Sequence, residues 1–324
     1  SVYTNWEKAS IEQGFAEENK LFYILTNSRG FTAAQTEKAH KEIAEVVDQV
    51  AKETGKEYLF ISRSDSTLRG HYPLETTILK DEYEKNTGKK IDGEVLCPFF
   101  KEGGRFTIDD VHYVQYDDTL VPAAETEFAK DKTFGYTVSN LKEYVEEKTQ
   151  GAYKKENVTA ISLENIRELN YDKIEEQLLA VEDFNKVIVN AIDYVDVKIF
   201  CVALFRAMKK GKNFMFRTAA AIVKVMGGVS DQPLLTREQM VVKETDHGGI
   251  IVVGSHTDKT TRQMEKLREN KDIAFVELNA TLVNDEAAFA EEVERCLALE
   301  EEYISSGKSV CVYTTRALIT ADTG

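Results

Sequence analysis

Residues 61–73 read Ile-Ser-Arg-Ser-Asp-Ser-Thr-Leu-Arg-Gly-His-Tyr-Pro. They follow an apolar run, residues 58–61, that has the length and composition of a buried strand. Open α/β sheets bind their ligands outside the carboxyl ends of their strands, and a polar loop directly after a strand lies at that edge. The stretch therefore predicts a strand that carries a binding loop at the edge of a parallel sheet.

The loop after this strand concentrates side chains that bind anions. Arg63 and Arg69 could each hold a carboxylate or a phosphate, and Asp65 could orient or deprotonate a hydroxyl. The hydroxyls that could donate and accept around them belong to Ser64, Ser66 and Thr67. The alternative is a capping loop, in which Asp65 or Ser66 satisfies the free N–H groups of the helix that Pro73 opens. Because a cap needs one such side chain, the composition favours a binding loop.

Short apolar runs alternate with amphipathic helical patterns along most of the chain. The strand-like runs are residues 20–26, 58–61, 93–98, 158–163, 186–191, 214–216, 249–253, 273–278 and 310–314. This alternation predicts an α/β protein of two domains, with largely parallel sheets flanked by helices. Turn chemistry between Gly228 and Gly248 marks the boundary, and we expect domains at residues 1–235 and 236–324.

A glycine-containing loop at residues 99–106 interrupts this alternation, before a hairpin expected through residues 107–115. The pair Gly103 and Gly104 would let the backbone approach a ligand closely, and Arg105 is placed to reach that ligand. A simple hairpin turn explains the same residues equally well.

A second strand runs directly into a polar turn at Gly254, Ser255 and His256, followed by a helical pattern over residues 259–270. Hydroxyls and free N–H groups at a helix start form an anion site that suits a nucleotide phosphate. The turn is neither a Walker A loop nor a Gly-x-Gly-x-x-Gly fingerprint, so the glycine alone is weak support.

The bulk composition bounds the class of protein. The chain has 324 residues, of which 42% are apolar and 30% charged, as is ordinary for a soluble globular protein. Its 41 basic and 56 acidic residues give a net charge of −15, which argues against a nucleic-acid partner or an anionic membrane surface.

The four cysteines are widely spaced and no apolar run is long enough to span a membrane, so we expect a cytoplasmic protein with reduced thiols. The chain starts at Ser1 without a methionine, and we expect it to be part of a longer protein.

Several chemistries lack their signatures in this sequence. There is no His-Glu-x-x-His, no Gly-x-Ser-x-Gly elbow and no cysteine with an evident partner, which disfavours metalloprotease, serine hydrolase and thiol chemistry. One loop rich in arginine and hydroxyls and one strand-to-helix anion site remain. That combination suits phosphoryl transfer from a nucleotide to a small polar anion.

The Ser-Asp-Ser-Thr-Leu-Arg-Gly run at residues 64–70 resembles the signature of the four-carbon acid sugar kinases, formerly a domain family of unknown function. Further similar motifs follow in the family's order at residues 26–29, 102–107, 190–196, 216–220 and 252–255. The resemblance implies an N-terminal acid-sugar-binding domain and a C-terminal nucleotide-binding domain. It also implies ATP-dependent phosphorylation of the terminal hydroxyl of an acid such as threonate or erythronate.

The resemblance also implies roles for individual residues. Arg29 and the residues 64–67 resemble the family's substrate-binding residues, and Ser255 resembles its ATP-binding serine. From their chemistry we add Arg69, Gly104 and Arg105 on the substrate side, and Gly254 and His256 beside the nucleotide. We expect Asp65 to be the catalytic residue, ATP and Mg²⁺ to be the cofactors, and no protein side chains to form a metal site.

The chain departs from the family pattern at both ends. Members usually open with an Asp-Asp-x-Thr-Gly segment and close with a glycine-rich nucleotide loop, and neither is present in the 324 residues. We therefore expect the nucleotide domain to be incomplete, or the chain to be a defective relative. The alternatives are a kinase of another polyhydroxy acid or sugar, and a non-catalytic sugar-acid sensor. A homodimer is left open.

Overall fold

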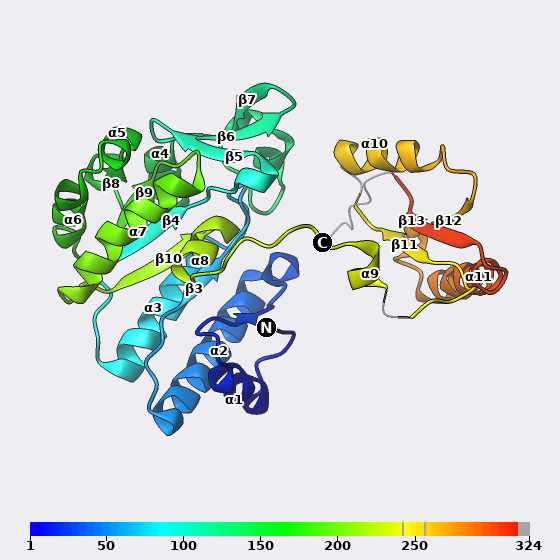
Figure 1. Cartoon of the computed structure of the whole chain (residues 1–324), viewed down its shortest axis with the longest axis horizontal. Helices are drawn as coiled ribbons and strands as arrows, with labels where there is room; N and C mark the ends of the chain where they lie inside the picture. The colour runs from blue at the N-terminus through cyan, green and yellow to red at the C-terminus, as the bar shows by residue number, and fades with distance from the viewer. Residues whose placement is uncertain (242, 256, 317–324) are drawn as a thin grey trace. The chain divides into compact units, whose positions relative to one another are not determined.

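The protein is described by a computed structural model, which covers residues 1–241, 243–255 and 257–316. The chain divides into two compact units that meet between Asp231 and Gln232, inside the polar stretch 228–248. Each unit is an α/β structure whose main sheet is parallel, as the sequence predicts. Figure 1 shows the labelled elements of each.

The first unit is built on a five-stranded parallel sheet in the order β3-β10-β4-β9-β8. Its strands are β3 (Ile61–Arg63), β10 (Phe214–Thr218), β4 (Gly93–Cys97), β9 (Asn185–Val189) and β8 (Thr159–Ile161). β4 and β10 are buried along their whole length, as expected for the centre of a parallel sheet covered on both faces.

Helices cover both faces of this sheet. Val95, Val187 and Phe216 pack with α5, α6, α7 and α8, whereas their strand neighbours Leu96 and Ile188 pack with α4 on the opposite face. The helices are α1 (Lys8–Ala16), α2 (Ala33–Thr54), α3 (Leu74–Thr87), α4 (Leu141–Lys148), α5 (Leu163–Arg167), α6 (Tyr171–Leu179), α7 (Tyr194–Lys209) and α8 (Ala220–Met226).

Two strand predictions in the first sixty residues are wrong in detail. The run 20–26 forms only β2 (Tyr23–Ile24), which pairs with β1 (Val2–Tyr3) outside the main sheet. The run 58–61 contributes only its last residue to β3, because Tyr58 and Phe60 pack against the cluster formed by α1 and α2. The apolar composition of both runs correctly predicted that their side chains pack in a core. Except at Ile61, however, they pack against α1 and α2 and do not lie in the main sheet.

The predicted hairpin is present and has a third strand. β5 (Arg105–Ile108), β6 (Val111–Tyr116) and β7 (Thr119–Pro122) form a small antiparallel sheet. Thr107 and Ala191 exchange two backbone hydrogen bonds of 3.1 and 3.0 Å, which tie this sheet to the segment after β9. Short 3₁₀ turns complete the unit at Ser28–Gly30, Lys101–Gly103, Ala123–Glu125, Glu127–Lys130 and Lys155–Asn157.

The second unit is a three-stranded parallel sheet in the order β11-β13-β12. Its elements are β11 (Ile250–Val253), β12 (Ile273–Leu278), β13 (Ser309–Thr314), α9 (Arg237–Met240), α10 (Asp258–Leu267), α11 (Glu286–Ser305) and a 3₁₀ turn at Ala280–Leu282. Ala274, Val276 and Val310 pack against Cys296 of α11 to form its core.

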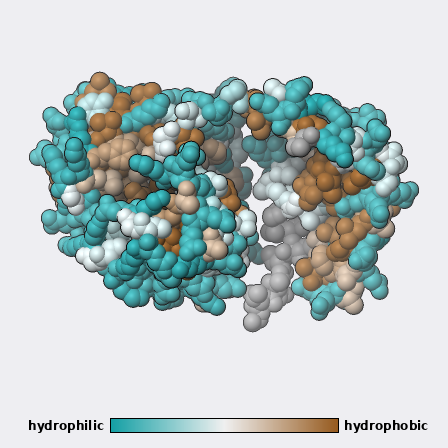
Figure 2. Space-filling model, turned by 60° about the horizontal axis from the view of Figure 1, so that its bottom comes forward, coloured by the Kyte–Doolittle hydropathy of each residue, from teal (hydrophilic) through white to brown (hydrophobic). Residues whose placement is uncertain are grey.

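Apolar side chains are also present on the surface. Figure 2 shows brown apolar patches between larger hydrophilic areas. In the first unit, Val195, Val202 and Phe205 of α7 are 55%, 42% and 44% exposed. No helix in the described residues is both long and apolar enough to cross a membrane.

Candidate functional site

The loop after β3 begins where β3 and β10 both end. The Ser64 N–H donates to the Thr218 carbonyl oxygen at 2.7 Å, and Arg217 donates to Ser64 Oγ at 2.6 Å. The predicted binding loop therefore lies at the carboxyl ends of two adjacent parallel strands. α3 follows the loop and begins without a side-chain cap, so neither Asp65 nor Ser66 serves the capping role considered above.

Asp65 is the centre of the polar contacts in this loop. Its Oδ2 accepts a hydrogen bond from Thr67 Oγ1 and another from Arg69 Nε at 2.7 Å, and Arg29 Nη1 lies 3.8 Å away. Burial would raise the pKa of the Asp65 carboxyl. The hydrogen bonds from Thr67 and Arg69 and the charges of Arg69 and Arg29 outweigh burial and lower that pKa. Asp65 is therefore ionised at neutral pH and acts as a hydrogen-bond acceptor.

Three arginines surround Asp65 or lie next to its partners. Arg29 comes from the turn after β2, and its side chain remains 56% exposed. The guanidinium carbons of Arg69 and Arg105 lie 4.9 and 5.6 Å from the centre of the Phe128 ring, which brings the two side chains together. Arg63, by contrast, is exposed and forms no ion pair within the described part of the chain. The structure thus gathers Arg29, Arg69 and Arg105 but leaves Arg63 out.

The glycine pair before Arg105 has a conformational explanation. Gly104 ends the 3₁₀ turn Lys101–Gly103 with φ +70°, and a Cβ there would lie 2.9 Å from Cβ of Gln115. Arg105 donates to the Gly103 carbonyl oxygen, and burial lowers the pKa of its guanidinium without discharging it. A Cβ at Gly103 would lie 2.9 Å from Nη1 of Arg105, so both glycines are needed for the turn that places Arg105.

The motif at residues 190–196 holds the Arg105 turn in place. Lys101 forms an ion pair with Asp193, and the Tyr194 hydroxyl donates to Glu102 at 2.8 Å. Asp193 also caps α7 by accepting from the Val195 N–H at 3.1 Å. This motif connects the helix start to the turn beside the candidate site.

Arg217 is the main residue of the site that sequence reasoning missed. It is 5% exposed, pairs with the buried Glu75 at 3.4 Å, and donates to the Arg69 carbonyl oxygen at 3.2 Å. Ser28, next to Arg29, donates to the other oxygen of Glu75 at 2.7 Å. The available signal was an arginine inside an otherwise apolar strand, since a buried charge needs a partner.

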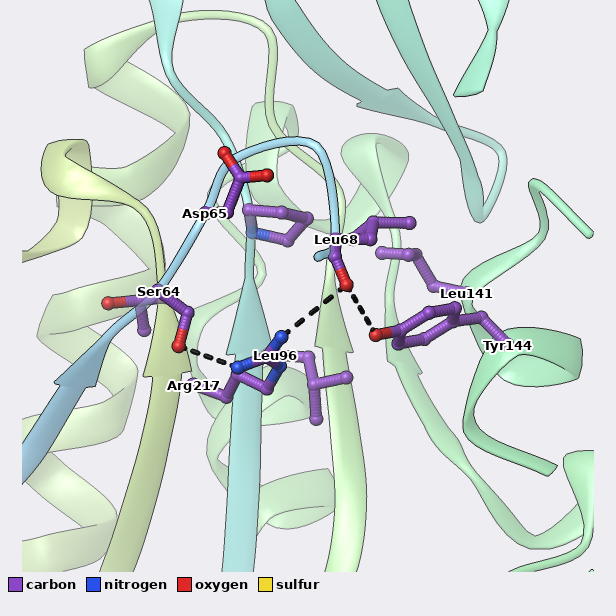
Figure 3. A pocket seen from close by; sticks show the side chains of 9 residues that line it. Ser64, Asp65, Leu68, Leu96, Leu141, Tyr144 and Arg217 are labelled. Atoms are coloured by element: carbon purple, nitrogen blue, oxygen red, sulfur yellow. Dashed lines mark hydrogen bonds between the residues drawn. The ribbon is translucent and has the colours of Figure 1, made fainter. Parts of the chain in front are cut away.

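Figure 3 shows the space enclosed beneath the loop. Ser64, Leu68, Leu96, Tyr144 and Arg217 line it together with Asp65, and its free volume is about 10 Å³. That volume suits about one water molecule, so an organic acid does not fit there. In the same view the Asp65 carboxylate points away from Arg217 and Tyr144.

The second candidate site is the turn after β11. Ser255 Oγ lies 3.2 Å from Thr257 Oγ1 and 3.1 Å from Thr260 Oγ1, and Thr314 Oγ1 donates to the Gly254 carbonyl oxygen at 3.2 Å. Thr257 is the N-cap residue of α10, and its side chain makes no capping hydrogen bond. His256 lies outside the described residues. Thr257 and Thr260 were not predicted as site residues, although their spacing after Ser255 was a usable signal.

The donor atoms of this turn suit a nucleotide but not a protein-bound metal. Hydroxyl groups and the N–H groups of a helix start are appropriate partners for phosphate oxygens. No group of three or more histidine, cysteine or acidic residues that could hold a metal occurs within residues 1–241, 243–255 and 257–316.

Both units match known domain families. Residues 3–226 match the sugar-binding N-terminal domain, and residues 250–323 match the nucleotide-binding C-terminal domain. No curated protein matches the sequence.

Two solved structures share the fold at low sequence identity. A Haemophilus influenzae protein from a domain family of unknown function is 16% identical, with a TM-score of 0.50, over 99% of this chain and 75% of its own. A Salmonella typhimurium protein provisionally called a tRNA synthase is 14% identical, with a TM-score of 0.59, over 91% of this chain and 64% of its own. The chain is thus shorter than both of these structures.

Proposed function

Because the chain belongs to the family of the sugar-binding N-terminal domain and carries a nucleotide-binding domain after it, we propose that it is an ATP-dependent sugar-acid kinase. Its substrate is a four-carbon acid of the threonate or erythronate type, phosphorylated on the terminal hydroxyl. The observation that carries this proposal is the cluster in which Arg29 and Arg69 face the ionised Asp65. Arginines suit the carboxylate of such an acid, and the aspartate suits its hydroxyl.

The acceptor side would bind the acid through its arginines. Arg29 is exposed and points a guanidinium at the loop, so it is available to a carboxylate from solvent. Arg69 and Arg105 add positive charge from a half-buried position beside Phe128, where the lower dielectric strengthens their attraction for an anion. A neutral sugar of the same length would gain none of this attraction.

Asp65 would orient the acceptor hydroxyl for attack. Its lowered pKa keeps the carboxylate ionised, and an ionised carboxylate can accept the hydroxyl hydrogen but is a weak base. Phosphoryl transfer tolerates a weak base, because its loose transition state depends on positioning and charge neutralisation more than on early proton removal. Thr67 and Arg69 hold the carboxylate in one orientation for this role.

The nucleotide side would bind ATP at the start of α10. Gly254 leaves open space where a side chain would lie, so phosphate oxygens can approach the backbone there. Ser255, Thr257 and Thr260 offer hydroxyl donors around that position. Mg²⁺ bound to the phosphates would neutralise charge on the transferred group.

Coupled detection of ADP formed by the full-length protein across a panel of four-carbon acids tests the proposal. We expect ADP formation with at least one acid and none with threitol or erythritol, which keep the hydroxyls but lack the carboxylate. Absence of ADP with every acid would overturn the kinase assignment, and saturable binding of an acid without turnover would favour a sugar-acid sensor.

A further inference from the structure

The backbone of residues 65–70 has an unusual imbalance between its acceptors and its donors. All six carbonyl oxygens accept a hydrogen bond of 3.5 Å or less from protein groups. Among the N–H groups of the same residues, the one of Leu68 donates, to the Asp65 carbonyl oxygen at 3.2 Å. The other five find no acceptor within the part of the chain that the structure describes.

Side chains of β6, α4 and β10, and of Tyr136 in the loop before α4, hold the carbonyl oxygens of residues 66–69. His112 Nε2 contacts the Ser66 oxygen at 2.8 Å, the Tyr136 hydroxyl contacts Thr67 at 2.9 Å, and the Tyr144 hydroxyl contacts Leu68 at 2.8 Å. Arg217 donates to the Arg69 oxygen at 3.2 Å and to the Leu68 oxygen at 3.5 Å. Figure 3 shows Tyr144 and Arg217 reaching Leu68 from below the loop. We call His112, Tyr136, Tyr144 and Arg217 the carbonyl cage.

Every member of the carbonyl cage must act as a donor, because a carbonyl oxygen only accepts. Each member is at most 5% exposed, and burial raises the pKa of both tyrosine hydroxyls, so they keep their protons. Burial lowers the pKa of His112 to about 4, so its ring is neutral. The proton of the neutral ring therefore lies on Nε2, and Nδ1 accepts from Thr107 Oγ1 at 3.0 Å.

The cage holds the loop in a backbone conformation that it would otherwise avoid. Leu68 has φ +68°, in the left-handed region that costs a side chain with a Cβ about 1 kcal/mol or more. Gly70 has φ +126°, and a Cβ there would lie 3.4 Å from Nη2 of Arg217. Strain of this kind persists where the surrounding contacts determine it, which is often at a ligand site.

Buried backbone donors normally have partners. The loop that carries the five N–H groups also carries Arg69, and Arg29 faces it at Asp65. Thr67 is only 1% exposed, so bulk water is a poor partner for its N–H group. We propose that the carbonyl cage is a set of positioning residues. Its hydrogen bonds occupy the carbonyl oxygens of residues 66–69 and hold the loop so that the other five N–H groups of residues 65–70 bind a small oxyanion. On the proposed function, that oxyanion is the carboxylate of the acid or the phosphoryl group in transfer.

The direct test is a titration of the full chain, labelled with ¹⁵N and ²H, with inorganic phosphate in one arm and threonate in the other. We expect the amide resonances of Asp65, Ser66, Thr67, Arg69 and Gly70 to shift and saturate, and the arm that binds more tightly identifies the oxyanion. Anion binding that leaves these amides unshifted, or no binding at millimolar concentration in either arm, would overturn the proposal.

Hydroxyl deletions distinguish positioning from stability. Tyr136→Phe and Tyr144→Phe each remove one donor, and we expect each to weaken oxyanion binding by roughly three- to tenfold while the KM for ATP stays unchanged. Tyr58→Phe is the matched control, since its hydroxyl donates to Asp48 at 3.4 Å in another cluster. Equal oxyanion affinity in all three variants, measured below their melting temperatures, would reduce the cage to a structural role.

The two proposals fail separately. Phosphate-induced shifts at the loop amides without ADP formation would retain the oxyanion loop and reject the kinase. ADP formation with unshifted amides would retain the kinase and reject the oxyanion loop.

Discussion

The loop after β3 and the turn after β11 occupy equivalent places in two parallel sheets but are held differently. Each follows a strand and precedes a helix. Residues 65–70 are fixed by buried side chains of β6, α4 and β10. Ser255 is exposed, and within the described residues its side chain contacts only the hydroxyls and N–H of its neighbours. The first loop is therefore held by buried contacts from other elements, whereas the Ser255 side chain is held by groups close to it in the sequence.

We expect the largest loss of turnover from a substitution at Asp65, in the loop after β3. Asp65→Asn removes the charge that orients the hydroxyl, and turnover should fall by about 10²- to 10⁴-fold, with the melting temperature and the KM for ATP little changed. Asp131→Asn is the control, since Asp131 also faces Arg69 but at 3.9 Å, and it should lose little activity. Turnover near that of the wild type in Asp65→Asn would sink the assigned role.

Arg217 tests how much of the loop's shape depends on one buried residue. Arg217→Met leaves Glu75 buried without its counter-charge, which should lower the free energy of unfolding by about 3–5 kcal/mol in urea titrations. Adding Glu75→Gln should recover part of this loss, because the two changes share one interaction. Lys90→Met removes an exposed ion pair with Asp183 and should cost under about 1 kcal/mol. Equal losses in the two single variants would contradict the contrast between buried and exposed contacts.

His112 makes the stability of the first unit depend on pH. Burial lowers the pKa of His112 to about 4 in the folded state, from an ordinary 6.5. Between pH 4 and pH 6.5, His112 is therefore protonated in the unfolded state but neutral in the folded state. The stabilisation is complete above pH 6.5 and is lost as the pH falls towards 4, on the order of 3 kcal/mol at 1.36 kcal/mol per unit. Urea titrations of wild type and His112→Gln across this range measure the difference. Parallel pH profiles would show that His112 does not cause it.

A substitution at Ser255 tests the turn after β11, and we expect it to have the smallest effect on kinetics. Ser255→Ala removes one exposed hydroxyl donor, so the KM for ATP should rise by roughly two- to tenfold while affinity for the acid stays constant. Ser306→Ala in the same unit is the control, because its hydroxyl donates to the Tyr303 carbonyl oxygen. A loss of acid affinity in Ser255→Ala would mean that the two sites are not separate.

The sequence predicted the parts of this structure that depend on local pattern. Alternating strands and helices, the loop at the end of β3 and the turn at Gly254 and Ser255 follow from hydrophobic period and turn chemistry. The carbonyl cage could not be predicted in the same way, because Tyr136 and Tyr144 meet residues 67 and 68 across more than sixty positions. The sequence around a tyrosine in a polar segment does not indicate which distant group its hydroxyl will contact.

Arg63 and Arg105 show that the sequence also could not predict where individual side chains would lie. Both are arginines beside glycine or hydroxyl residues, and their composition predicted the same role. Arg63 belongs to β3 and is exposed, whereas Arg105 opens β5 and lies over Phe128. Strand register, which depends on tertiary pairing, decided between them.

Calorimetric titration of the nucleotide-free full chain with the four-carbon acid that yields ADP tests the central claim most directly. On the proposed function, Arg29, Asp65, Arg69 and Arg105 all lie in the first unit, so the account predicts saturable binding of one acid per chain without ATP. An acid that is turned over with ATP but gives no binding in its absence would contradict it.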